Sequence, residues 1–420
     1  MRGGPRSAPG RRLGTCRRVL GVLVVSGRFF KRTVRDVHWE GRTALVRVDF
    51  NVPLRGPRVM DDTRILAALP TIRYLMAGGA RVVLTSHLGR PGGKRTMSMS
   101  LRPLVPVLEK ALGLPVAFAT DAVGPRAKRV VDELRAGDVA LVENTRFYPE
   151  EERNDTTFAR ALAGLADTFV EDAFGAVHRA HASTVGVTAH LPSVAGLLLE
   201  REVLALERLL EPEAPFVAIV GGAKISDKLS VMEQLLGRVQ RLLVGGGMAN
   251  TLLAALGYDM GRSLVEAEQI PAAERLIAEA KRRGVELQLP IDLVVANFFL
   301  EQADHRVVQV EQVPPNWLAL DIGPLTVERF AQALADARTV FWNGPLGVAE
   351  WPNFAEGTAG VARAVAASPG FTVVGGGDSI AALRRLDLAS QIQHLSTGGG
   401  ASLEFLEGRP LPGIACLEDR

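Results

Sequence analysis

Cysteine is scarce in this 420-residue chain, in which Cys16 and Cys416 are the only two. Two cysteines cannot form a disulfide framework, and this favours a reducing compartment such as the cytoplasm. No apolar run approaches the ~18 residues of a membrane-spanning helix, so we expect no membrane partner. The net charge of +3 is too small to indicate a nucleic-acid partner.

Lysine is also scarce, since only 7 of the 49 basic residues are Lys. Two of them, Lys224 and Lys228, follow an apolar run at 216–220 and two glycines. Their i, i+4 spacing predicts two ammonium groups on one face of a helix start that binds an anion such as a phosphate chain. The alternative is a surface turn with two solvated lysines. In a chain that otherwise uses Arg, the pair favours the anion site.

Acidic residues are absent from residues 1–28, which contain seven Arg and a short apolar run at 19–25. A cleaved targeting peptide has this composition, and so does upstream sequence joined by a misassigned start codon. The apolar run is short and interrupted by Gly21, which favours the second explanation. Either way, we expect an N-terminal extension that is disordered or misannotated and lies outside the fold.

From residue 29 onward, apolar segments alternate with amphipathic ones. This alternation predicts parallel sheets that are covered by helices on both faces. The predicted strands form two series, 44–49, 81–86, 139–142 and 168–170, and then 216–220, 242–244, 293–295, 339–342, 371–374 and 391–395. We therefore predict an α/β protein of two Rossmann-like, three-layer lobes with parallel sheets.

Leucines at helical spacing fill residues 197–213, and Pro212 and Pro215 end this segment. We predict a helical hinge over residues 197–215. It would join an N-terminal domain of residues 29–196 to a C-terminal domain of residues 216–405.

Basic residues follow the predicted strands of the first half. In open parallel sheets, ligands bind at the carboxyl ends of the strands. In this half the segments there are DFN at 49–51, HLGR at 87–90, ENTR at 143–146 and DAFGAVHRAH at 172–181. Arginine binds carboxylate and phosphate through two parallel hydrogen bonds. The first half is therefore predicted to bind a small, highly charged anion.

Glycines follow the predicted strands of the second half. The segments are GGAK at 221–224, GGGM at 245–248, NGPLG at 343–347, GGGD at 375–378 and TGGG at 397–400. Glycine lets backbone N–H groups approach phosphates closely, with helix N-termini behind them. This predicts a nucleotide site. No segment reads G-x-x-x-x-G-K-[ST], and no G-x-G-x-x-G with a following acid opens a helix, which disfavours a P-loop or a dinucleotide fingerprint.

Three further positions have alternative interpretations. Asp378 could hold Mg²⁺ that is bridged to nucleotide phosphates, or it could cap a helix over 380–386, a role that Ser379 could also take. His178 and His181 could ligate a metal, but the spacing supplies no third ligand, which favours anion contact or packing. Glu350 could accept ribose hydroxyls or be an exposed loop acid. The default for Trp342, Trp351 and Phe354 is core packing rather than a base pocket.

Eleven segments, in order, together resemble the phosphoglycerate kinase family in its bacterial form. They are VRVDFNVPL, DDTRI, TSHLGRP, ENTRFYPEEE, DAFGAVHRAH, GGAKISDKL, GGGMANT, LDIGP, FWNGPLGVAEW, VGGGDS and STGGGASLEFLEG. The resemblance extends from Arg32 to Leu417 and implies reversible phosphoryl transfer from 1,3-bisphosphoglycerate to ADP, giving 3-phosphoglycerate and ATP, with Mg²⁺. It also implies a cytoplasmic, two-lobed monomer that closes on its substrates and whose residues 406–420 return to the N-terminal domain.

The resemblance implies roles for individual residues. It assigns substrate binding to Asp49, Asn51, Arg64, His87, Leu88, Gly89, Arg90, Arg146, His178 and Arg179. It assigns nucleotide binding to Lys224, Lys228, Gly246, Gly323, Asn343, Glu350, Gly375, Gly376, Gly377, Asp378 and Ser379, with Asp378 as the metal ligand. The implied catalytic residues are Arg64, Lys224, Gly377 and Gly400.

Two residues depart from the family pattern, since Glu171 stands where Asn is common and Ala349 where an aromatic residue is common. We expect the first to alter support of the basic residues and the second to loosen the base or ribose pocket. The alternatives to a phosphoglycerate kinase are an NAD-linked dehydrogenase and a two-lobed binding protein without turnover.

Overall fold

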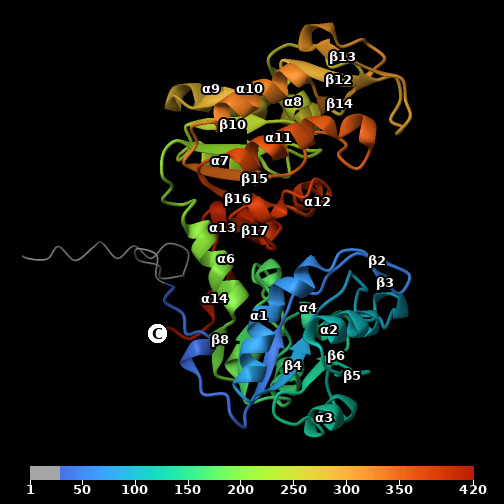
Figure 1. Ribbon diagram of the computed structural model, residues 1–420, viewed down its shortest axis with the longest axis vertical. Coiled ribbons are helices and arrows are strands. Elements are labelled where there is room, and N and C mark those ends of the chain that lie inside the picture. The colour runs from blue at the N-terminus through green and yellow to red at the C-terminus, as the bar shows by residue number, and fades with distance from the viewer. Residues whose placement is uncertain (1–28) are drawn as a thin grey trace, which may run out of the picture.

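The structure is a computed structural model that describes residues 29–420. The extension predicted over residues 1–28 lies outside the described residues. Two six-stranded sheets organise the chain, and Figure 1 shows them in two lobes, with the first half of the chain below and the second half above.

The first lobe contains a parallel sheet with the strand order β5-β6-β4-β1-β7-β8. Its strands are β1 (Thr43–Arg47), β4 (Arg81–Thr85), β5 (Val116–Ala119), β6 (Val139–Val142), β7 (Thr168–Glu171) and β8 (Ser193–Ala195). A small hairpin of β2 (Leu54–Arg55) and β3 (Arg58–Val59) precedes the first long helix. All four strands predicted in this half are present.

The second lobe repeats this plan with the order β11-β10-β9-β15-β16-β17, again with all neighbours parallel. Its strands are β9 (Phe216–Val220), β10 (Arg241–Val244), β11 (Glu286–Gln288), β15 (Thr339–Asn343), β16 (Phe371–Gly375) and β17 (His394–Ser396). The predicted α/β fold class with two parallel-sheet lobes is confirmed.

One predicted strand belongs to a different sheet. The segment predicted at 293–295 is β12 (Asp292–Ala296), which lies between β13 (His305–Gln309) and β14 (Leu318–Ile322) in a separate antiparallel sheet. Its place in a parallel sheet was therefore predicted wrongly. An apolar run specifies a strand, but it does not specify which partner that strand will pair with.

Helices cover both faces of the two parallel sheets. Those of the first half are α1 (Thr63–Ala77), α2 (Val105–Leu112), α3 (Pro125–Asp132), α4 (Pro149–Glu152), α5 (Thr156–Ala163) and α6 (Leu197–Glu207). Those of the second half are α7 (Leu229–Leu235), α8 (Gly247–Ala255), α9 (Ile270–Arg283), α10 (Pro324–Leu334), α11 (Glu356–Ala367), α12 (Gly377–Arg385), α13 (Gly400–Leu406) and α14 (Pro412–Ala415).

The alternation of side chains along a strand explains this layering. In β1, Val46 packs into the core cluster that includes residues of α1 and α2, whereas Leu45 packs into the cluster that includes α3 and α5. In β9, Ile219 likewise packs with α10 and α11, and Ala218 with α7 and α8. Successive residues of a strand point to opposite faces, so a strand that is buried on both faces reads as a continuous apolar run.

Helix α6 connects the lobes and is shorter than the segment predicted at 197–213, because it ends at Glu207. Residues 208–210 continue as turns, with Leu209 N–H bonded to the carbonyl of Leu206. Figure 1 shows α6 running between the two lobes.

The end of the chain lies against the first lobe. Lys31, only 3% exposed, donates from Nζ to the carbonyls of Ala415 and Leu417 and pairs with Asp419 at 2.7 Å. Gly413 N–H donates to the carbonyl of Val177, the residue before His178, at 2.8 Å. The last residues therefore support the loop that carries His178.

Candidate active site

The basic strand ends of the first lobe surround one cavity of about 300 Å³, which the glycine loop after β17 of the second lobe also lines. The lining residues are Asp49, Asn51, Arg64, His87, Gly89, Arg90, Arg146, Gly175, Ala176, His178, Arg179, Gly398, Gly399 and Gly400. The structure thus brings together every predicted substrate-binding residue except Leu88, together with Gly400. We call this space the basic cavity.

Leu88 is the exception because its side chain is buried and only 5% exposed, outside the lining of the basic cavity. Its backbone N–H donates to Oδ1 of Asn144, and its carbonyl accepts from the amide nitrogen of Asn144 at 2.8 Å. Leu88 therefore fixes the path of the loop that carries its neighbours Gly89 and Arg90.

Hydrogen bonds hold the acidic and amide groups of the basic cavity in place. Arg64 Nη1 donates to Oδ2 of Asp49 at 2.6 Å, and Asn51 accepts from Gly89 N–H at 2.9 Å. Asp61, one turn before Arg64, pairs instead with Arg384 of α12 at 3.3 Å. This last ion pair joins the two lobes.

Arg146 is the most enclosed arginine in the lining of the basic cavity, at 3% exposure. Its Nη1 donates to the carbonyl of Gly89 at 2.7 Å, and its Nε lies 3.1 Å from Oε1 of Glu152. Burial, and then repulsion from Arg179, lowers the pKa of Arg146 to about 10. The group therefore remains a cation at neutral pH and keeps its donors fixed for an anion.

Arg47 supports the basic cavity through His87, and the sequence reasoning missed it. It lies inside β1 at 1% exposure, donating from Nε to Oγ of Ser183 at 2.8 Å, and its Nη2 lies 3.0 Å from Nδ1 of His87. A guanidinium can only donate, so Nδ1 of His87 accepts and the ring proton is on Nε2. An arginine within an apolar strand was the available signal, because such residues are rarely buried unless they are paired.

His87, His178 and His181 are neutral at neutral pH. Burial, and then the charge of Arg47, holds the pKa of His87 well below its usual value. Burial is also the main cause for His178 and His181, each with a pKa lowered to about 4, and neighbouring arginines add to it. Of the three, His87 and His178 line the basic cavity, so their neutral rings present N–H groups and lone pairs there while the arginines carry the charge.

Glu171, the first departure from the family pattern, is fully buried at the end of β7. Its Oε1 accepts from Ala173 N–H at 2.9 Å, and its Oε2 has no hydrogen-bond partner among the described residues. Burial raises the pKa of Glu171 well above its usual value, although Arg47 opposes the shift. A buried carboxyl group therefore lies beside Arg47, which is paired with Glu171 across the neighbouring strands β1 and β7.

In the second lobe, the predicted turn with two lysines is not a helix start. Lys224 and Lys228 both precede α7, which begins at Leu229, so the predicted single helical face is wrong. Glu266 explains the difference, because its carboxylate accepts from both the N–H and the hydroxyl of Ser226 at 3.0 and 2.6 Å. Such side-chain bonds compete with helix formation.

The two lysines have different environments. Lys228 Nζ donates to the carbonyls of Gly221 and Asn343 at 2.5 and 2.9 Å, and burial lowers its pKa to about 8 despite Asp227 and Asp378 nearby. Lys224 is exposed. Lys228 thus holds two strand-end loops together, while Lys224 extends from the same turn into solvent.

Several glycines of the second lobe serve loop packing. A Cβ on Gly221 would lie 2.1 Å from the carbonyl oxygen of Pro345, and a Cβ on Gly246 would lie 2.8 Å from that of Gly222. By contrast, a Cβ on Gly377 or Gly400 would meet no atom within 4 Å. The two predicted catalytic glycines therefore begin helices α12 and α13 with open space in front of the backbone.

Asp378 lies in the first turn of α12 and is exposed, whereas the N-cap is Gly376, without a side-chain hydrogen bond. The alternative in which Asp378 or Ser379 caps this helix is therefore wrong. Ser379 is buried, and its Oγ accepts from Gly344 N–H at 2.8 Å. Among residues 29–420 the Asp378 carboxylate has no salt bridge or hydrogen-bond partner, and it lies beside the open Gly377.

The remaining predicted nucleotide-binding residues occupy strand ends and loops. Asn343 ends β15, and Gly375 ends β16 beside it. Gly323 precedes α10 and packs against the Asp292 carboxylate, which a Cβ would approach to 2.3 Å. Glu350 is an exposed loop residue.

Core packing was the expected default for the three aromatic residues near that loop, and two of them follow it. Trp342 and Phe354 are fully buried. Trp351 is partly exposed and packs against Phe299 in a tilted arrangement, with ring centroids 4.7 Å apart. Ala349, the second departure, is buried, and its carbonyl accepts from Arg385 at 2.6 Å.

A buried hydrogen-bond network joins the connecting helix to the second lobe. Glu202 of α6 accepts from Thr397 N–H and Oγ1 at 2.6 and 2.8 Å and lies 2.7 Å from Nε2 of His394. Despite complete burial, these partners lower the pKa of Glu202. Thr397 is followed by Gly398, so this network fixes the loop that lines the basic cavity.

A cavity for a small anion on one lobe, faced by glycine-rich helix starts on the other, defines a two-lobed α/β phosphotransferase. The phosphoglycerate kinase family model matches residues 34–409, and the chain belongs to that family. The predicted family and the predicted activity as a kinase are thereby confirmed. The NAD-linked dehydrogenase and the binding protein without turnover are excluded as identities of the chain.

Relatives and solved structures agree with this assignment. The chain is 56% identical to phosphoglycerate kinase of Moorella thermoacetica over 93% of this chain and 100% of that protein, and 56% identical to that of a Roseiflexus species over 93% and 99%. The structure of phosphoglycerate kinase from Coxiella burnetii matches with a TM-score of 0.81 at 42% identity, and that from Pyrococcus horikoshii with 0.81 at 33%. Both matches cover 92% of this chain and 98% of the other. Within residues 29–420 no helix is long and apolar enough to cross a membrane.

We expect His178 to make the stability of the protein sensitive to acid. The folded pKa of His178 is about 4, against an ordinary value of 6.5, so the unfolded chain binds a proton first as the pH falls. Stability should therefore decrease between pH 6.5 and 4. His178→Gln removes this contribution and should lose less stability than the wild type between pH 7 and 5 in urea unfolding. His38→Gln is the control, since the His38 side chain is 82% exposed and should leave the pH dependence unchanged. Identical pH slopes for His178→Gln and the wild type would contradict the assignment.

Proposed function

We propose that the chain catalyses reversible phosphoryl transfer from 1,3-bisphosphoglycerate to ADP, with the triose in the basic cavity and the nucleotide at the glycine loops of the second lobe. The observation that carries the proposal is the lining of the basic cavity, in which arginines of one lobe meet the 398–400 loop of the other. A phosphorylated carboxylate with several negative charges suits this lining. Each lobe thus holds one substrate.

The chemistry requires positioning and charge stabilisation more than proton transfer. The carboxylate of 3-phosphoglycerate is ionised at neutral pH, so the nucleophile needs no general base. Arg90, Arg146 and Arg179 would hold the triose, with neutral His87 donating from Nε2. Arg64 and Lys224 would meet the charge on the phosphoryl group in transfer, beside the open helix starts at Gly377 and Gly400.

A coupled assay of ATP formation from ADP and 1,3-bisphosphoglycerate tests the activity, and Arg64→Ala tests the mechanism. An arginine that stabilises a phosphoryl group in transfer can contribute on the order of 10³ to 10⁵ in kcat. Arg64→Ala should therefore lower kcat far more than it raises KM for 3-phosphoglycerate, and Arg64→Lys should recover little because it lacks the planar fork.

Arg73→Ala is the matched control, because Arg73 lies on the same helix and donates to Ala111 rather than lining the basic cavity. It should retain normal rates, and thermal melts check the folding of every variant. If Arg64→Ala keeps kcat within a factor of a few while the wild type is active, the transition-state role passes to Lys224. An inactive wild-type protein would refute the proposed function itself.

Mg²⁺ would be held by Asp378 together with nucleotide phosphates. The carboxylate is exposed in the first turn of α12. Mg²⁺ commonly keeps several waters and binds one or two protein carboxylates plus phosphates, so a single carboxylate fits this ion. When bound, the ion would neutralise phosphate charge, and the α12 start would orient the same phosphates.

Asp378→Asn should weaken binding of the Mg²⁺–ADP complex by about tenfold, or about 1.4 kcal/mol, because it removes a charged oxygen ligand while preserving side-chain shape. Binding of metal-free ADP should change much less. Calorimetric titrations with Mg²⁺ and with EDTA make the comparison. Equal losses under both conditions would show that Asp378 does not hold the metal.

We also propose the domain division itself, with residues 29–196 and 406–420 forming a triose-binding domain, 197–215 the hinge and 216–405 a nucleotide-binding domain. The two substrates then bind different lobes, so transfer requires the lobes to close and exclude water. Glu202 supports this role for the hinge, since it bonds the loop before Gly398. The protein would act as a cytoplasmic monomer on small molecules, and cell fractionation tests the location.

Small-angle scattering tests closure and the oligomeric state together. The radius of gyration should decrease when ADP and 3-phosphoglycerate bind together, and change little with either alone, because neither alone favours the closed state strongly. The forward scattering should correspond to one 45.0 kDa chain. An unchanged radius with both ligands would contradict closure, and a doubled mass would contradict the monomer.

A further inference from the structure

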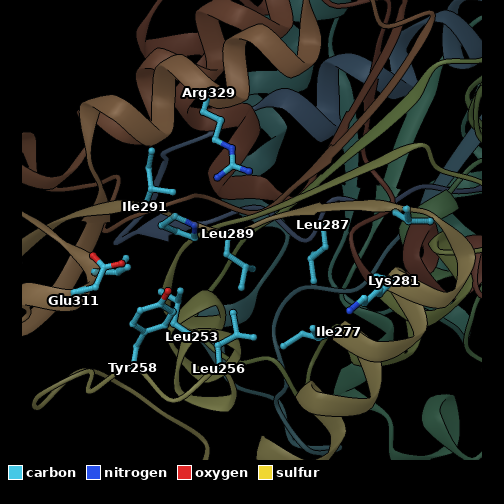
Figure 2. A pocket seen from close by; sticks show the side chains of 14 residues that line it. Leu253, Leu256, Tyr258, Ile277, Lys281, Leu287, Leu289, Ile291, Glu311 and Arg329 are labelled. Carbon is cyan, nitrogen blue, oxygen red and sulfur yellow. The ribbon is translucent and has the colours of Figure 1, made fainter.

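The second lobe contains a further pocket of about 420 Å³ that lies between α8, α9, β11 and α10. Its walls are mainly aliphatic, and Figure 2 shows them as sticks. The lining comprises Leu253, Leu256, Tyr258, Ile277, Ala280, Lys281, Val285, Leu287, Leu289, Pro290, Ile291, Val310, Glu311 and Arg329. None of these residues is predicted to bind the nucleotide or the triose. We call this the lateral pocket.

The size and lining of the lateral pocket are typical of small-molecule sites. Such sites measure about 300–1,000 Å³ and combine apolar walls with a few polar groups that fix orientation. Leu256 and Ile291 are 52% and 38% exposed, so a ligand would cover apolar surface that now faces water. Burial of such surface stabilises a complex by about 25 cal/mol per Å² before the costs of association.

Charged groups stand around this apolar wall. Lys281 comes from α9 and Arg329 from α10, and both are exposed. In Figure 2 the cationic ends of both side chains point toward the apolar wall, and Glu311 lies on the opposite side of the view from Lys281. Within residues 29–420, none of these three side chains has a salt bridge or a hydrogen bond, and the ion pairs of α9 join Glu279 to Arg282 and Arg283 instead.

The simplest alternative is that these cations only cover the crevice with their aliphatic stems, as long basic side chains commonly do. That arrangement needs no partner for the charged ends. Two cations and one carboxylate nevertheless leave a net positive rim beside an apolar wall, and charge complementarity then selects a negative headgroup. A carboxylate would bind Arg329 through two parallel hydrogen bonds and lie away from Glu311.

We propose that the lateral pocket binds a small organic monoanion, a carboxylate with an apolar body of medium-chain length. The body would lie on Leu253, Leu256 and Leu289, and the carboxylate would lie between Lys281 and Arg329. Helices α8 and α10 line this pocket and also begin beside Gly246 and Gly323, the predicted nucleotide contacts. The site is thus separate from the nucleotide loops but is built on the same two helices.

The experiment uses the full chain saturated with ADP and 3-phosphoglycerate, so that the basic cavity cannot bind the probe. Three probes are titrated by calorimetry: octanoate, octylammonium with the same body and the opposite charge, and acetate with the same headgroup and no body. Octanoate should bind at least about tenfold more tightly than either control, since the site requires both parts. Its affinity should decrease as salt concentration rises.

Four variants place the binding in the lateral pocket. Arg329→Gln and Lys281→Gln should each weaken octanoate binding by about threefold or more, and Glu311→Gln should strengthen it, because the last change removes repulsion. Arg275→Gln is the matched control on α9, since Arg275 is exposed and does not line the pocket. It should bind octanoate as the wild type does.

All the substituted side chains are exposed, so the variants should fold, and thermal melts check this. Equal affinity for octanoate and octylammonium would overturn the proposal, as would loss of binding that is the same in Arg275→Gln as in Arg329→Gln. An undetectable interaction of octanoate with the wild-type protein would also overturn it. The kinase assay decides the proposed function separately, because none of these residues lines the basic cavity.

Discussion

The crowding of positive charge at one sheet edge is the constraint on which the site depends. Arg64, Arg90, Arg146 and Arg179 all line a cavity of about 300 Å³. Their repulsion is evident at Arg146, because its pKa is lowered first by burial and then by the positive charge of Arg179. The protein offsets this cost with a single carboxylate in the lining, that of Asp49, rather than with full neutralisation. A ligand with several negative charges relieves the remaining repulsion, whereas a neutral triose would leave it in place, so the same cost provides selectivity.

Much of the fold follows from the sequence because its signals are local. Apolar runs separated by amphipathic segments predicted the central strands of both sheets, and these strands are buried on both faces as a continuous run requires. The strand-end rule then grouped residues that are distant in sequence, such as Asn51, Arg146 and Arg179, into one basic cavity. Their convergence needed only the knowledge that parallel strands end at the same edge. Motif resemblance added the particular chemistry, which neither periodicity nor spacing specifies.

The failures of prediction involve non-local partners. Strand β12 has an ordinary apolar pattern. Its antiparallel pairing with β13 and β14 depends on those other segments, about which the pattern of β12 carries no information. Arg47 was overlooked because its role depends on His87 and Ser183, which are 40 and 136 residues away. The helix predicted around Lys224 and Lys228 failed for the same reason, since Glu266 holds the turn from 40 residues further along. In each case the outcome depends on a partner that is distant in sequence, which a local pattern does not encode.

The two lysines that first indicated a nucleotide site illustrate how one short motif supplies two physical functions. Lys228 is largely desolvated, and its Nζ donates to the carbonyls of Gly221 and Asn343. These two residues lie at the ends of the neighbouring strands β9 and β15. Removing it would leave two carbonyls of the glycine loops without their donor, so its first contribution is to the shape of the loops. Lys224 remains exposed and has a flexible stem, so it can follow a phosphate across the gap between the lobes. Under the proposed mechanism, one ammonium is fixed and builds the loops, and the other is mobile and would meet the charge in transfer. This division of roles would account for Lys rather than Arg at both positions of an arginine-rich chain.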